Sequence, residues 1–151
     1  MEIKKGTFTL VTLLFLYLVG FSYSSLARIK EADIIQYSLR TNNYEYKNDE
    51  INEMLFHQIL NSFSSDYWDF MVLSPDEPMN NNTFIQVGAP EANTQFKFTL
   101  ETGFDDGKGN RKMYRCYIEN QQVILQYVID YWERQQVPDI SFWEDVTHEM
   151  G

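Results

Sequence analysis

Cysteine and histidine are scarce in this sequence, and the shortage argues against several kinds of site. The single cysteine, Cys116, cannot form a disulfide within the chain, and only two histidines, His57 and His148, are present. A zinc site needs Cys and His clustered at motif spacing, and a Ser or Cys nucleophile needs a base beside it. We therefore predict no metal site, no catalytic residues and no cofactor. Cys116 lies in an alternating stretch, which favours a small buried side chain over a reactive thiol.

Basic residues are also few. The chain has 12 Lys and Arg against 22 Asp and Glu, a net charge of −10, and seven acids but only one base follow Arg115. A protein that neutralises phosphates needs a basic face, so this composition argues against nucleic-acid binding. An acidic surface serves solubility alone, or it steers association with a basic protein partner.

The N-terminus has the composition of a membrane-directing segment. Lys4 and Lys5 precede an uncharged, strongly apolar run over residues 6–26. The pattern matches a secretory signal, and the run is also long enough to span a bilayer as an uncleaved signal-anchor helix. We therefore predict a leader over residues 1–27 and a single domain over residues 28–151. That domain would lie outside the cytoplasm, secreted or attached to the membrane through its N-terminal segment.

Apolar periodicity in the rest of the chain predicts an α+β domain with two helices on one face of a mostly antiparallel sheet of about five to six strands. In the strand at 95–101, outward polar residues that include Glu101 predict that the face of the sheet without helices is exposed to solvent. A glycine-containing turn at 105–110 predicts a hairpin. The predicted strands are 33–39, 69–73, 83–88, 95–101 and 112–118, with a last extended piece at 140–147; the predicted helices run from Asn48 or Asp49 to Phe63 and from Asn120 to Gln136.

Acidic residues could still form a site once the chain folds. The turn Asp105–Asn110 superficially resembles a calcium loop, but it lacks alternating ligands and a closing glutamate. Paired carboxylates could hydrolyse a glycan, although neither Glu144 with Asp145 nor Asp66 with Asp69 stands out as such a pair. Solvated charges beside aromatic residues at the edge of the core are the simpler interpretation of both.

Four short stretches, 68–73, 84–86, 113–115 and 143–146, together with the predicted helix that runs to Trp132, carry a resemblance that covers about 37–146. In apolar pattern they resemble small bacterial immunity-like proteins, which are one-domain α+β proteins associated with polymorphic toxin systems. The resemblance implies a non-enzymatic protein that occupies the active site or substrate path of a secreted toxin.

If the resemblance holds, we expect the contacts to include the aromatic and acidic residues of the last third, namely Trp143, Glu144 and Asp145. Two other functions remain open from the sequence. One is an extracytoplasmic glycan hydrolase that uses two carboxylates, and the other is a membrane-anchored structural protein.

Overall fold

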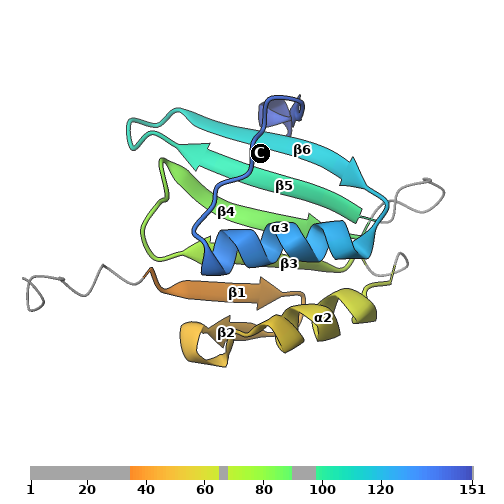
Figure 1. Cartoon of the computed structure of the whole chain (residues 1–151). Helices are drawn as coiled ribbons and strands as arrows, with labels where there is room; N and C mark the ends of the chain where they lie inside the picture. The colour runs from red at the N-terminus through yellow and green to blue at the C-terminus, as the bar shows by residue number, and fades with distance from the viewer. Residues whose placement is uncertain (1–34, 65–67, 90–97, 151) are drawn as a thin grey trace, which may run out of the picture. The chain divides into compact units, whose positions relative to one another are not determined.

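An antiparallel sheet of seven strands forms the framework of the domain (Figure 1). The computed structural model describes residues 35–64, 68–89 and 98–150, so the predicted leader and its hydrophobic helix lie outside the described residues. The strands are β1 (Tyr37–Thr41), β2 (Glu45–Lys47), β3 (Phe70–Pro75), β4 (Asn82–Gly88), β5 (Phe98–Asp105), β6 (Arg111–Ile118) and β7 (Glu144–Asp145), in the spatial order β2-β1-β3-β4-β5-β6-β7.

The predicted α+β class is confirmed, but the sheet has one strand more than the predicted maximum of six. The strand that the sequence did not reveal is β2, which has only three residues, too few for alternation to be visible. A tight turn holds it beside β1, with the Thr41 N–H donating to the Tyr44 carbonyl at 2.8 Å. The predicted piece at 140–147 is also shorter than expected, because only β7 pairs with the sheet.

The helices are α2 (Glu53–Ser62) and α3 (Gln121–Glu133). The predicted start of the first helix at Asn48 or Asp49 is wrong, because 48–50 forms a separate 3₁₀ turn and the cap is Asn52, whose Oδ1 accepts from the Leu55 N–H at 3.0 Å. The predicted cap of α3 at Asn120 is confirmed. That helix ends at Glu133, before the predicted Gln136.

Both helices pack on one face of the sheet and form the hydrophobic core with it (Figure 1). The Phe56 ring of α2 meets Trp132 of α3 edge-on at 5.5 Å, and Phe63, which follows α2, lies 6.4 Å from Phe98 of β5. Burial of each such large side chain contributes roughly 1.5–3 kcal/mol, so the core needs no crosslink. Within the described ranges, no helix is long and apolar enough to cross a membrane.

A chain of hydrogen bonds crosses this core. The Tyr131 hydroxyl donates to Asn82 Oδ1 at 2.7 Å, and Asn82 Nδ2 donates to Thr102 Oγ1 at 2.6 Å. The Tyr37 hydroxyl donates in turn to the Tyr131 carbonyl at 2.9 Å. These hydrogen bonds link α3 to β1, β4 and β5. Each of the buried polar groups has a partner, so none of them is left unsatisfied. Burial raises the pKa of Tyr37 to about 12 and also raises that of Tyr131, so both hydroxyls act as neutral donors.

Candidate partner-binding surface

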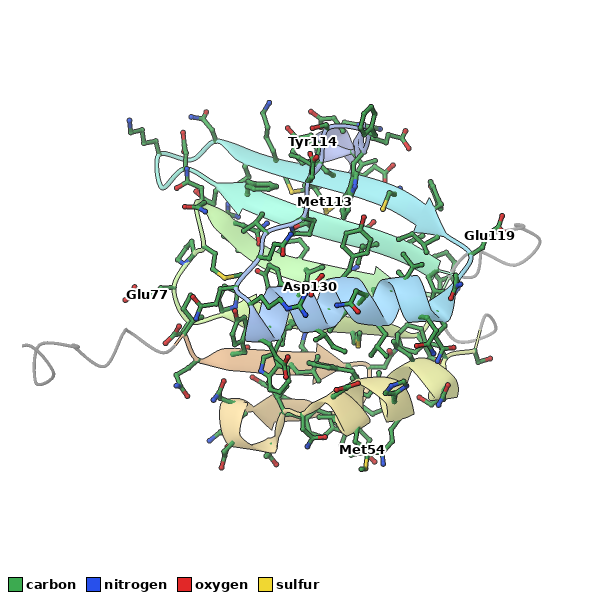
Figure 2. All side chains as sticks on the ribbon, viewed as in Figure 1. Met54, Glu77, Met113, Tyr114, Glu119 and Asp130 are labelled. Atoms are coloured by element: carbon green, nitrogen blue, oxygen red, sulfur yellow. The ribbon has the colours of Figure 1, made fainter. Side chains whose placement is uncertain are left out.

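The chain that follows α3 passes around the β6 edge of the sheet, from the helix-covered face to the opposite face. Before the edge, the Trp143 ring packs edge-on against Tyr127 of α3, with ring centroids 6.1 Å apart. At the edge, Val146 is fully buried and its N–H donates to the Met113 carbonyl of β6 at 2.9 Å. The 3₁₀ turn η2 (Thr147–Glu149) then ends on the opposite face. Met113, labelled in Figure 2, belongs to β6.

The three residues predicted to contact a partner have different environments. Glu144 and Asp145 are exposed, as a contact surface requires. Trp143 is half-buried against the core, whereas the neighbouring ring of Phe142 is 96% exposed. This irregular stretch has no periodicity from which the sequence could indicate which of the two adjacent aromatic residues packs on the core. The exposed aromatic residue of the segment is therefore Phe142, which the sequence analysis did not select.

The face of the sheet opposite the helices carries a row of polar side chains. Gln86, Glu101, Arg115 and Glu144 are successive partners across β4, β5, β6 and β7, and paired residues of neighbouring antiparallel strands project from the same face. The prediction that this face is exposed to solvent is wrong at Glu101, which is only 7% exposed. The reason is that the long side chain of Arg115 covers it.

Arg115 holds two carboxylates at once. Its Nε lies 2.6 Å from Glu101 Oε1, and its Nη2 and Nη1 donate to the two oxygens of Glu149 at 2.7 and 3.2 Å. Gln86 Nε2 donates to the other oxygen of Glu101 at 2.8 Å. Burial disfavours the charged guanidinium, but the hydrogen bonds to Glu149 and Glu101 prevail and raise the Arg115 pKa. The same contact lowers the pKa of Glu149 and fastens η2 to this face.

A cavity of about 730 Å³ opens on this face between the start of β3 and η2. Aromatic side chains line it together with acidic ones, and the lining includes Trp68, Phe70, Asp69, Glu101, Tyr117 and Glu149. The volume lies within the range of roughly 300–1,000 Å³ typical of ligand pockets. Chemically, the cavity combines flat apolar walls with negative charge.

The side chains considered for catalysis lie apart from one another. His57 is on α2, 3.9 Å from Glu53, and the His148 side chain is 74% exposed. Cys116 packs against the core, as predicted, and burial raises the pKa of its thiol to about 11, well away from a nucleophilic thiolate. Asp69 lies in the cavity, while Asp66 is outside the described residues.

The acidic turn between β5 and β6 forms the predicted hairpin, in register from Asp105 and Arg111 onward. Asp105 Oδ1 accepts from the Gly107 N–H and Asp106 Oδ1 from the Lys108 N–H, both at 2.8 Å. The carboxylates thus stabilise the turn itself. Across residues 35–64, 68–89 and 98–150, no group of three or more His, Cys, Asp or Glu is placed to hold a metal ion.

Comparison with known proteins found no relative of this chain. No protein-family model, no curated protein and no solved structure matches this chain.

Proposed function

We propose that the chain is a non-enzymatic binding protein, of the immunity-like kind, that neutralises a cognate toxin by direct contact. The observation that carries the proposal is the position of Phe142, whose side chain is 96% exposed on a segment held in place on both sides. Trp143 packs on α3 directly after it, and Asp139 accepts from the Ser141 N–H at 3.0 Å directly before it. An exposed ring on a segment with an anchored neighbour offers apolar contact area to a partner.

Acidic residues lie on both sides of Phe142 in the sequence. Asp139, Glu144 and Asp145 are exposed and lie within three residues of Phe142. An aromatic anchor with a charged rim is the arrangement in which the anchor supplies binding energy and the rim supplies the rate of encounter. The partner that fits this surface is a protein with a basic patch around an apolar pocket, which is consistent with the resemblance to immunity-like proteins.

The place of the encounter follows from the leader. With a membrane-directing segment over residues 1–27, the domain acts outside the cytoplasm, either secreted or attached to the membrane. We propose that it meets the toxin there. Protection would then take place at the cell envelope.

Protection from a toxin tests the proposal. The protein encoded directly upstream is produced in a bacterial host with and without this chain, and we expect growth to stop without it and to continue with it. Phe142→Ser should abolish protection while the unfolding midpoint stays within about 1 °C of wild type, because the ring contributes almost nothing to the core. Full protection by Phe142→Ser, or an upstream protein that is harmless in every compartment, would refute the proposal.

A further inference from the structure

The cavity on the uncovered sheet face is a second surface, distinct from the segment around Phe142. Its walls include Trp68 and Tyr117, whose side chains are 72% and 43% exposed, and Phe70. Three aromatic residues gathered in one cavity form an apolar surface, and such surfaces often mark a binding site. The concave shape presents the aromatic walls to anything that enters.

Trp68 is held in position by its neighbours. Its backbone has φ of 52°, a conformation that a bulky residue adopts only where the surroundings enforce it. Asn42 supplies part of that constraint, because its Nδ2 donates to the Trp68 carbonyl at 3.4 Å and its Oδ1 accepts from the Phe70 N–H at 2.9 Å. The backbone that carries the indole is therefore held at the cavity.

The floor of the cavity stays open for a specific reason. Gly88 of β4 lies there, and a Cβ at this position would come within 2.7 Å of Thr99 Oγ1. Any other residue would displace the Thr99 side chain and fill part of the space. The glycine thus preserves part of the volume of the cavity.

The charge of the lining is negative. The lining holds three carboxylates, those of Asp69, Glu101 and Glu149, and one guanidinium, that of Arg115, so three negative charges minus one positive charge leave a balance of −2. Arg40 lies 6.0 Å from the Phe70 ring centroid but is not part of the lining. A partly enclosed site with excess negative charge and aromatic walls attracts a cation that also stacks.

We propose that this cavity receives an arginine side chain presented by a partner protein. Of the biological cations, the guanidinium group combines a planar face that stacks on Trp68 and Tyr117 with paired donors that match a carboxylate such as Asp69. Lysine has a compact ammonium group and lacks the planar face. The inference goes beyond the toxin-neutralising role, because it concerns a different surface and holds for any partner that presents the side chain.

Titration of the full-length protein with N-acetyl-arginine N-methylamide tests this inference, with the Trp68 indole N–H and the Gly88 amide followed by NMR. The matched probe is the citrulline analogue, which has the same shape and no charge. We expect both signals to shift and saturate with the arginine probe, and the affinity for the citrulline probe to be at least about tenfold lower. Equal affinities, or shifts that do not saturate, would overturn the proposal.

Two acid variants separate the cavity from overall charge. Asp69→Asn and Glu119→Gln each remove one negative charge; Asp69 belongs to the lining, whereas Glu119 is an exposed residue outside it (Figure 2). Affinity for the arginine probe should fall severalfold in the first variant and stay unchanged in the second. Trp68→Ala, at an exposed position that leaves the core intact, should also weaken binding severalfold. Equal losses in both acid variants, or unaltered binding in Trp68→Ala, would contradict the proposal.

Discussion

The Arg115 guanidinium lies 2.6 Å from the carboxylate of Glu101 on the sheet face that the helices leave uncovered. Glu101 is nearly buried, so removal of its partner would leave an uncompensated charge of which little is accessible to water. Because the same guanidinium also binds Glu149, one side chain connects a central strand to the last turn of the chain. The stability of the fold and the attachment of η2 are therefore coupled through Arg115.

Breaking the ion pair between Arg115 and Glu101 should destabilise the folded protein. We expect Arg115→Met to lower the free energy of unfolding by about 3 kcal/mol or more, since Glu101 would remain buried without a counter-charge. The matched control is Arg134→Met, which removes an ion pair with Asp130 on the outer surface of α3 (Figure 2) and should cost no more than about 0.5 kcal/mol. Urea unfolding measures both values. Similar small losses would show that the Arg115 pair is screened by solvent.

The contact between Arg115 and Glu149 should also make stability depend on pH. The hydrogen bond from Arg115 lowers the pKa of Glu149 below its ordinary value of 4.5, so the folded state favours the carboxylate. A carboxylate whose pKa is lower in the folded state contributes stability above the unfolded pKa and loses it as the pH falls through the folded pKa. The stability of wild type relative to Glu149→Gln should therefore be full at neutral pH and decline below about pH 4.5.

The control for this dependence is the same comparison in an Arg115→Met background, in which the main cause of the shift is absent. There, the single variant Arg115→Met is compared with the double variant that carries Arg115→Met and Glu149→Gln. The difference in stability between these two proteins should change much less over the same pH range. Urea midpoints between about pH 3 and pH 7 are the measurement. An identical decline in both backgrounds would assign the effect to another group.

The hydrogen-bond chain in the core gives a third expectation. Tyr131→Phe removes the hydroxyl that donates to Asn82 Oδ1 at 2.7 Å and leaves a buried acceptor without that donor. Loss of a buried partner costs about 1–3 kcal/mol. The same change at Tyr44, which is 66% exposed, should alter the free energy of unfolding by less than about 0.5 kcal/mol. Equal effects at the two tyrosines, measured by urea unfolding, would mean that the hydrogen bonds crossing the core add no net stability.

Long periodic segments were predictable from the sequence, and short ones were not. Asn120 and the apolar stripe after it predicted α3, and the turn at 105–110 predicted the β5–β6 hairpin. By contrast, β2 has three residues and β7 has two, and both depend on pairing with a neighbouring strand rather than on a pattern of their own. The start of α2 was misplaced because two asparagines, Asn48 and Asn52, are both of a type that caps helices, and only Asn52 does so.

The sites depended on contacts that no local pattern encodes. The sequence predicted that Glu101 lies on a solvent-exposed face. Alternation along a strand indicates which face a residue occupies, but it does not indicate which side chains cover that residue. Its cover, Arg115, comes from the next strand, and Glu149 comes from a turn 34 residues further along. The cavity is likewise assembled from β3, β4, β5, β6 and η2. Only the acidic character of the C-terminal third was evident beforehand, from its excess of acids.

The last prediction separates three kinds of residue in the C-terminal segment. Trp143→Ala should lower the free energy of unfolding by about 2 kcal/mol, because the half-buried ring packs on Tyr127. Phe142→Ala should leave stability unchanged and speed dissociation from the toxin, with a cost of about 2 kcal/mol in binding.

Replacement of Glu144 and Asp145 together by Ser should mainly slow association and weaken its dependence on salt, since exposed charges act during encounter. Urea unfolding and surface plasmon resonance against the toxin, on the same protein preparations, distinguish the three effects. Faster dissociation with intact stability in Trp143→Ala would instead place Trp143 at the contact. An unchanged toxin affinity in both Phe142→Ala and the Glu144/Asp145 double variant would exclude this segment as the binding surface, because neither its apolar anchor nor its charged rim would then take part.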